Sequence, residues 1–259
     1  MVPNSFCFPF GDSTEVRIFG KRVGDLGIEH IAQVASDLRL SRVLHPSTDA
    51  FNGEVCTEGD LISRRRIGEV EFLFDYPADG ILIPPYSMAW FRTADCPTIV
   101  TKHNDGRVIA AHAGRYSLLD RAKIAGEQGR KFASVVDAIL DRLFWPRRDV
   151  LSLNVFSCCG VGPISFLHSY NHPIHGEWNR RMNAFVRDNY GADCFLDNDL
   201  GTGALDLHQL IRNQFAKKGI PADQIHRDKI DTANDAGRWF SRCHGDRTGH
   251  NTLLVIRRD

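Results

Sequence analysis

The stretch from Thr93 to Gly114, TADCPTIVTKHNDGRVIAAHAG, is the part of the sequence that decides the fold. Two apolar runs within it, 98–103 and 107–112, each have the length and composition of a β-strand. They are separated by Asn104-Asp105-Gly106, residue types that tolerate the positive φ a tight hairpin turn demands. The stretch therefore predicts an antiparallel hairpin.

Pairing of the two runs would bring Cys96 and His112 to the same end of this hairpin, at a strand-to-loop edge where sites are commonly built. A thiolate beside an imidazole has two natural uses: it can bind zinc, or it can form a nucleophile and its base. A small buried cysteine and a histidine bonded to a carbonyl would fit the pattern equally well. Spacing alone leaves the three interpretations open.

Periodicity outside the hairpin predicts a mixed α/β class. Apolar residues recur at helical spacing in four segments, 26–40, 120–145, 177–190 and 206–218, with Pro146 ending the second because proline cannot continue a helix. Strand-forming residues dominate 69–76, 80–83, 98–103, 107–112, 150–157 and 252–258.

Composition limits the class of protein. The 259 residues, 42% of them hydrophobic, can bury the core of one large domain, which we take as the default. Because 32 basic residues balance 32 acidic ones, no overall charge favours nucleic acid or an anionic membrane. There is neither a basic leader nor an apolar run of membrane-spanning length, and the seven scattered cysteines suit reduced thiols. We expect a cytoplasmic protein.

Further motifs accompany the hairpin in a recognisable order. The segments are Ala78-Asp79-Gly80, Thr93-Ala94-Asp95-Cys96, His112-Ala113-Gly114, and the strings at 158–166, 205–221 and 239–250. Together, over about residues 75–257, they resemble the multicopper polyphenol oxidase (laccase-domain) family, whose members include purine nucleoside phosphorylases and the peptidoglycan editing factor. The resemblance implies a single domain over residues 1–259, with about 70 divergent N-terminal residues. It also implies an α+β fold whose mixed β-sheets are sandwiched by helices in α/β/β/α-like layers.

The resemblance also implies a metal site. Zinc in this family is bound by a cysteine, by the histidine of the His-Ala-Gly turn and by an upstream histidine in a Gln-x-His motif. The matching positions are Cys96, His112 and His45, although Val43 stands where the glutamine would be. Three protein ligands leave one tetrahedral position open, as in catalytic zinc sites. One cysteine and two histidines would also suit copper, which is the alternative cofactor.

The chain departs from the family where arginines are expected. Arg115-Tyr116-Ser117 follows the His-Ala-Gly turn in place of Trp-Arg-Gly, and Arg242-Cys243-His244 replaces Tyr-Arg-Arg. His250 replaces the arginine of a Thr-Gly-Arg segment. Arginine forks are the preferred clamp for phosphate, so these changes bear on phosphorolysis rather than on the metal. We expect Thr93, Arg115 and Arg242 to bind substrate or phosphate.

The leading hypothesis is a zinc-dependent enzyme that acts on purine nucleosides, by phosphorolysis, by adenosine deamination or by both. Cys96 and His112 would be catalytic, and Asp95 would serve as a general acid/base or support the ligand beside it. The partners would be a purine nucleoside and phosphate. Three alternatives remain: a copper-dependent phenol oxidase, a hydrolase with Cys96 as nucleophile and His112 as base, and a degenerate metal-stabilised binding protein.

Other conspicuous residues have simpler interpretations. Cys158-Cys159 is expected to be a structural turn after a core strand, because adjacent cysteines rarely point into one site. The histidines His168, His172 and His175 are expected to lie in a polar loop rather than to bind a second metal. Cys243-His244 and His250 occupy the family's arginine positions, which makes them candidates for lining the site.

Overall fold

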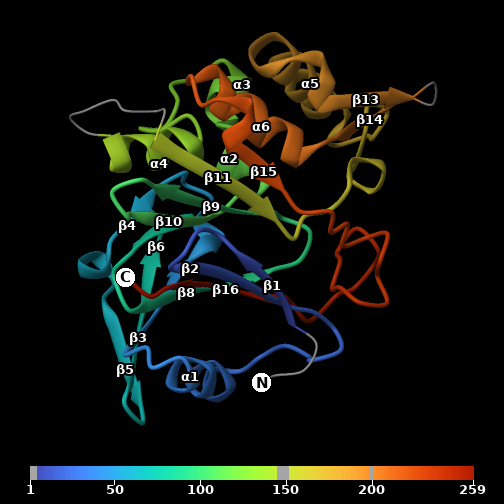
Figure 1. Ribbon diagram of the computed structural model, residues 1–259. Coiled ribbons are helices and arrows are strands. Elements are labelled where there is room, and N and C mark those ends of the chain that lie inside the picture. Colours follow the sequence, from blue (N-terminus) through green and yellow to red (C-terminus); the bar gives the residue numbers. More distant parts are fainter. Residues whose placement is uncertain (1–4, 145–151, 199–200) are drawn as a thin grey trace.

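Two β-sheets pack face to face, and helices cover both outer faces (Figure 1). The computed structural model describes residues 5–144, 152–198 and 201–259. The order of layers, one helix, two sheets and a second group of helices, is the α/β/β/α arrangement that the family resemblance implied.

The first sheet has the strand order β1-β2-β16-β8-β3-β6-β5. Its strands are β1 (Ser5–Pro9), β2 (Thr14–Phe19), β3 (Arg42–Ser47), β5 (Ser63–Ile67), β6 (Val70–Pro77), β8 (Ser87–Thr93) and β16 (Asn251–Arg257). The C-terminal strand β16 pairs with β2 on one side and β8 on the other, so residues from both ends of the chain meet in this sheet.

The second sheet has the order β15-β11-β9-β10-β7-β4, and a small third sheet has the order β12-β14-β13. The strands of the second sheet are β4 (Val55–Cys56), β7 (Gly80–Ile83), β9 (Thr98–His103), β10 (Val108–His112), β11 (Leu153–Cys158) and β15 (Ile225–Arg227). Those of the third are β12 (Leu167–Ser169), β13 (Phe195–Asn198) and β14 (Thr202–Leu205).

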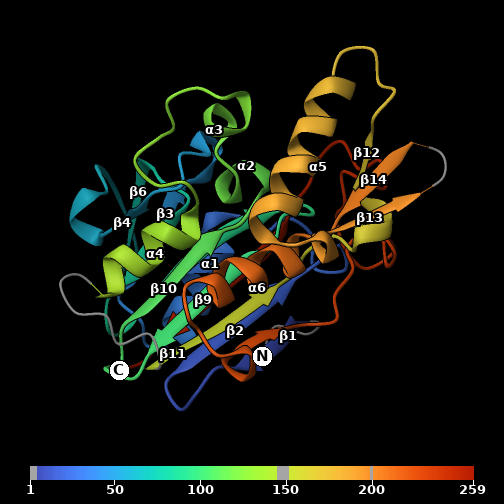
Figure 2. The ribbon, with the colours of Figure 1, turned by 90° about the horizontal axis from the view of Figure 1, so that it is seen from above.

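The helices lie on the two outer faces. Helix α1 (Ile28–Asp37) covers the first sheet, and α4 and α6 lie over the second, with α5 beside the third sheet (Figure 2). The bounds of the others are α2 (Arg115–Leu118), α3 (Arg121–Ala125), α4 (Val135–Phe144), α5 (Gly176–Tyr190) and α6 (Leu207–Lys217).

Three apolar cores fill the spaces between the layers. Ile31, Val34 and Ala35 of α1 pack on the outer face of the first sheet. Strand residues such as Leu44 and Val100 fill the space between the sheets, and residues of α4 and α6 cover the second sheet. Burial of apolar area between layers is the main stabilising contribution in such an architecture.

The predicted hairpin is confirmed: β9 pairs with β10 so that His112 lies opposite Thr98. Gly106 in its turn has a φ of 88°, which a residue without a Cβ adopts freely. The register places the segment that follows Cys96 directly beside the segment that ends at His112. The two side chains singled out in the sequence therefore lie at one end of the hairpin.

The continuous helix predicted over 120–145 is wrong. Helix α3 ends at Ala125, where Gly126 takes a left-handed φ of 80°, and α4 begins only at Val135. The apolar spacing on both sides of the break is helical, but glycine at this position ends the first helix. The expected stop at Pro146 and the start of the strand predicted from residue 150 lie outside the described residues.

Candidate active site

Cys96 and His112 converge on one point beside Gly114. A Cβ placed on Gly114 would lie 3.1 Å from His112 Nε2 and 3.2 Å from Cys96 Sγ. The thiol and the imidazole nitrogen are thus neighbours across the end of the hairpin, as the strand register requires. Absence of a side chain at Gly114 leaves the space in which they meet.

A buried carboxylate faces the other nitrogen of the His112 ring. His112 Nδ1 lies 3.5 Å from Asp79 Oδ1 and 3.3 Å from Ser117 Oγ. The Ser117 hydroxyl donates to Asp79 Oδ1 at 2.7 Å, and the Gly53 N–H donates to Oδ2 at 2.6 Å. These contacts direct Nδ1 toward the carboxylate and leave Nε2 for Cys96 or a ligand.

The charge state of His112 depends on this pair of neighbours. Burial lowers its pKa, but the negative charge of Cys96 and the hydrogen bond to Asp79 outweigh burial and raise the pKa to about 10. The two neighbours therefore favour the positively charged form of the His112 ring.

His45 has the chemistry of a metal ligand but lies apart from this pair. Its Nδ1 is 2.7 Å from the carbonyl oxygen of Trp90, which can only accept, and its ring stacks on Trp90 at 4.5 Å. Burial lowers its pKa, which favours the neutral ring with Nε2 unprotonated, as metal-binding histidines require.

Cys96, His112 and His45 are residue types that bind metals, but the three side chains do not lie close enough together to hold one ion. Within residues 5–144, 152–198 and 201–259, no three His, Cys, Asp or Glu side chains are grouped closely enough to hold a metal ion. The structure brings together Cys96 and His112, and it leaves His45 on β3 against Trp90. A bound metal would require the third donor to approach the other two.

Asp95 holds the connection between β8 and β9 to later parts of the chain. Its Oδ1 accepts the Thr232 hydroxyl at 2.6 Å, and its Oδ2 accepts the Cys243 N–H at 2.8 Å. Its carbonyl accepts the Val161 N–H at 2.8 Å. Nearby, the Thr93 hydroxyl donates to the Cys96 carbonyl and closes the turn. Both residues thus make local contacts that fix the position of Cys96.

Arg115 begins α2 directly after Gly114. Its guanidinium lies 4.4 Å over the ring of Tyr116 and donates to the Tyr116 hydroxyl at 2.7 Å. Another of its nitrogens is 3.2 Å from Nδ1 of His168. Burial, followed by the charge of Arg115, lowers the pKa of His168 to about 3, so this neutral ring accepts the hydrogen bond. Arg115 is therefore a cation held by Tyr116 and His168, two residues after the His112-Ala113 end of the hairpin.

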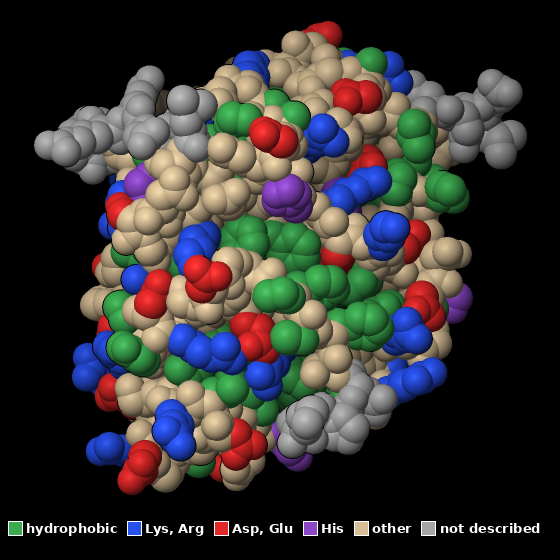
Figure 3. Space-filling view, in the orientation of Figure 1, with side chains coloured by type: hydrophobic (Ala, Val, Ile, Leu, Met, Phe, Trp, Pro, Cys, Tyr) green, Lys and Arg blue, Asp and Glu red, His purple; other side chains and the backbone are tan. Residues whose placement is uncertain are grey.

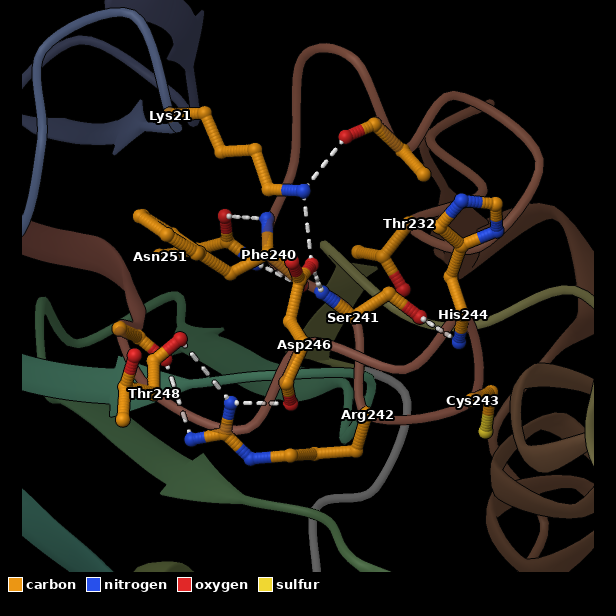
Figure 4. Close-up of polar contacts among 12 residues, drawn as sticks. Lys21, Thr232, Phe240, Ser241, Arg242, Cys243, His244, Asp246, Thr248 and Asn251 are labelled. Carbon is orange, nitrogen blue, oxygen red and sulfur yellow. Dashed lines mark hydrogen bonds and ion pairs between the residues drawn. The ribbon is translucent and has the colours of Figure 1, made fainter.

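The guanidinium of Arg242 is used within its own loop (Figure 4). It donates to the carbonyls of Asp246 at 2.9 Å, Thr248 at 3.4 Å and Gly249 at 3.1 Å. The loop is also tied to the N-terminal half, because Lys21 forms an ion pair with Asp246 at 2.8 Å. Arg242 holds the loop that carries Cys243.

Of the residues that stand in the family's arginine positions, Cys243 contacts the site, because its N–H donates to Asp95 Oδ2. Burial and the neighbouring Asp95 raise the pKa of its thiol to about 12. The N–H of His244 donates to Ser241 Oγ at 3.1 Å, which is a contact inside the loop. His250 lies between Arg92 and Asp25, with its Nδ1 at 3.2 Å and 3.5 Å from them.

The remaining candidates are structural. Cys158 and Cys159 are fully buried at the end of β11, and all seven cysteines are free. His172 Nδ1 accepts the N–H groups of residues 174 and 175, which holds a turn before α5. The expectation that His168 lies in the same polar loop is wrong, because His168 is buried on β12 of the third sheet.

Two residues of the site were missed by sequence reasoning. Asp79 was noted only as part of a family motif, although a fully buried carboxylate beside a histidine is a strong functional signal once burial is known. Ser117 gave no signal, because nothing in its local sequence shows that it reaches back to Asp79.

The C-terminal part of the chain and the fold as a whole both have relatives. Residues 169–258 match a family described as multi-copper polyphenol oxidoreductase laccase. No curated protein matches the chain. No helix of the described residues has the length and apolar character needed to cross a membrane.

Solved structures share the whole fold at low identity. A Neisseria meningitidis protein of family DUF152 is 14% identical with a TM-score of 0.70, over 99% of this chain and all (100%) of that one. YlmD from Geobacillus stearothermophilus is 16% identical with a TM-score of 0.70, over 99% and 100%. Bacillus licheniformis YfiH is 16% identical with a TM-score of 0.63, over 94% and 92%.

Proposed function

We propose that the chain, whose residues 169–258 match the multi-copper polyphenol oxidoreductase (laccase) family, is a divergent member of that family and a zinc-dependent enzyme acting on purine nucleosides. The observation that supports the proposal best is the convergence of Cys96 Sγ and His112 Nε2 beside Gly114. A soft thiolate and an imidazole nitrogen are donors that zinc prefers.

Cys96 and His112 would hold the metal, with His45 as third ligand. Bound zinc supplies a positive charge that acidifies a water molecule or polarises a substrate bond. The contact of His112 Nδ1 with Asp79 and Ser117 keeps the ring turned toward Cys96 and strengthens Nε2 as a donor. For His45, the Trp90 carbonyl has the same effect on Nε2.

The arginines near the site bear on which reaction occurs. Phosphorolysis requires a bound phosphate, and Arg242 already donates to three carbonyls of its loop. Arg115 follows the His-Ala-Gly turn directly, but its guanidinium contacts Tyr116 and His168. One arginine fork is a weaker phosphate site than several, so we favour deamination of adenosine or another hydrolysis over phosphorolysis.

The test combines metal analysis with a phosphate-dependence assay on adenosine and inosine. We expect stoichiometric zinc in the purified protein, lost in Cys96→Ser and His112→Ala and retained in the control His172→Ala. We expect inosine to form from adenosine without phosphate. Free base appearing only with phosphate would instead identify a phosphorylase, and bound copper with phenol oxidation would identify an oxidase. A fully zinc-loaded protein that converts no nucleoside would contradict the proposal and would favour a metal-stabilised binding protein.

A second candidate follows from the Cys96–His112–Asp79 contacts themselves. In a thiol hydrolase, His112 would accept the proton of Cys96, and Asp79 would orient the ring. This candidate needs no third ligand, which agrees with the position of His45 against Trp90. It predicts a protein isolated without metal whose Cys96 is alkylated rapidly by iodoacetamide. Slow alkylation that speeds up only after zinc is chelated would argue for the metalloenzyme.

Partners and location form part of the same proposal. Balanced charge, with 32 basic and 32 acidic residues, favours small-molecule partners over nucleic acid or a membrane surface. All seven thiols are free, which suits the reducing cytoplasm.

A further inference from the structure

A cavity of about 630 Å³ opens at the far end of the β9–β10 hairpin from Cys96 and His112. Its lining comes from the N-terminal segment around Phe10, from the end of β9, from β11 and from β15. Strand β9 has six residues, so the cavity lies roughly 20 Å from the candidate active site. This volume is in the range that holds a small molecule.

One wall of the cavity is aromatic. Phe8 packs against Phe156 with ring centroids 5.5 Å apart, and Phe10 packs against Phe156 at 6.1 Å. Phe156 is buried, whereas Phe8 and Phe10 are only half-buried. Apolar side chains gather on the face of the molecule that carries β1 and β11 (Figure 3). Flat rings stack favourably on such a surface.

Polar groups stand opposite this wall. The Lys102 ammonium donates to Ser13 Oγ at 3.0 Å and has two further N–H donors. Asn104, Asn154 and His226 also line the cavity. An ammonium beside an aromatic wall selects a ring that carries an acceptor or a negative charge.

The charge of the lining limits the ligand further. Among the described residues that line the cavity, Lys102 is the single lysine or arginine, and Asp12 is the single acidic residue. Asp259 is also near, since it accepts the hydroxyl of Ser13. One cation with acids close by suits a single negative charge better than the double charge of a phosphate.

We propose that this cavity is a second binding site, which takes a small planar aromatic molecule carrying one carboxylate. The ring would stack on Phe8, Phe10 and Phe156, and the carboxylate would reach Lys102. The site is independent of the nucleoside chemistry proposed above, because its residues belong to the opposite end of the hairpin.

Indole-3-acetate is a suitable probe, to be titrated into the full chain by calorimetry and by protein-observed NMR. Lys102→Met removes the charge and should weaken binding about tenfold, the loss of one charge-assisted hydrogen bond. Phe10→Leu keeps apolar volume but removes a ring, and should weaken binding about fivefold. The matched control Lys123→Met, on the exposed surface of α3, should bind like the wild type.

Two comparison ligands test the chemistry. Indole-3-acetamide lacks the charge, and cyclohexylacetate lacks the aromatic ring, so both should bind more weakly than indole-3-acetate. NMR shifts should appear at residues of the cavity such as Asn154 and Phe156. Absence of binding, equal binding of all three ligands, or shifts confined to the Cys96–His112 end would overturn the proposal. So would shifts at the cavity that depend on protein concentration alone, which would indicate a second copy of the chain as the occupant.

Discussion

Gly114 lies where a side chain would enter the Cys96–His112 pair. An alanine Cβ there would be 2.7 Å from His112 Cε1, closer than real contacts allow, so the ring would have to move. We predict that Gly114→Ala weakens binding of the proposed zinc ion at least tenfold, while the free energy of unfolding falls by only about 1–3 kcal/mol. Chelator competition and urea unfolding measure the two effects.

Gly27→Ala is the matched control for this substitution, because nothing lies within 4 Å of a Cβ at Gly27. It should leave zinc affinity unchanged. Wild-type affinity in Gly114→Ala would show that the metal does not depend on the convergence of Cys96 and His112.

Asp95 is the residue through which the site and the C-terminal loop are joined. It has a φ of 82°, which asparagine tolerates better than most residues, so Asp95→Asn keeps the backbone. The amide cannot accept from both the Thr232 hydroxyl and the Cys243 N–H. The free energy of unfolding should therefore fall by about 1–3 kcal/mol. Amide hydrogen exchange in residues 240–250 should quicken. The exposed control Asp12→Asn should change neither quantity.

His208 should make stability depend on pH. Burial lowers its pKa to about 4, and its Nδ1 lies 2.8 Å from Ser157 Oγ. The folded-state pKa of His208 lies below the unfolded value of about 6.5. Its contribution to the free energy of unfolding is therefore fully present above a pH of about 6.5 and is lost as the pH falls toward about 4. We predict a loss of about 2 kcal/mol from this residue by pH 5. Urea unfolding of the wild type and His208→Gln at pH 7 and pH 5 measures it, and an equal pH effect in both proteins would contradict the prediction.

Arg130 connects segments that surround His112. Its guanidinium donates to the carbonyls of Phe51, Tyr116, Ser117 and Phe132 at 2.6 to 2.9 Å. We predict that Arg130→Met, which keeps the apolar stem, lowers unfolding free energy by about 2–4 kcal/mol because several carbonyls lose their donor. Denaturant unfolding checks this, with Arg22→Met on the exposed surface as control. A loss below about 1 kcal/mol in Arg130→Met, roughly the contribution of a single hydrogen bond, would show that water replaces the donor.

Elements with a strong local signal were predictable from the sequence, and those defined by distant partners were not. The β9–β10 hairpin follows from its turn residues and apolar runs. Strand β8 was not predicted, because it is buried along almost its whole length and shows no polar alternation. Strand β3 was not predicted either, because it contains Pro46, which is rare inside a strand and lies here at the register shift between His45 and Ser47.

The same division applies to the candidate site. Cys96 and His112 lie on one hairpin, so local pairing brings them together. The place of His45 depends on how β3 packs beside β8, where the Trp90 carbonyl takes its Nδ1, and no local pattern encodes that contact. Arg242 was expected at a phosphate, but its neighbouring loop carbonyls are revealed only by the fold.

The whole molecule should unfold as one unit. Strands β7 and β10 contribute residues to the core between the sheets, and their opposite faces pack against the core beneath the helices. The layers are therefore not separable. We predict a single thermal transition with a calorimetric enthalpy equal to the van't Hoff enthalpy. Two resolved transitions would instead indicate two domains.

Removal of residues 251–259 should abolish folding rather than weaken it. Strand β16 is buried from Asn251 to Ile256 and lies between β2 and β8, so its loss breaks the first sheet in two. Circular dichroism and proteolysis of the truncated chain test this expectation. A native-like melting curve for that chain would contradict it.

The central position of β16 also has a consequence for biosynthesis. The β1–β2 hairpin is made long before its partner in the sheet, β16, which lies near the other end of this sequence. For most of synthesis the nascent chain therefore carries an unpaired β2 edge, which is prone to wrong pairing and aggregation. A holding chaperone would be expected to occupy that edge until β16 emerges, so heterologous yield should respond to chaperone supply and to slower translation.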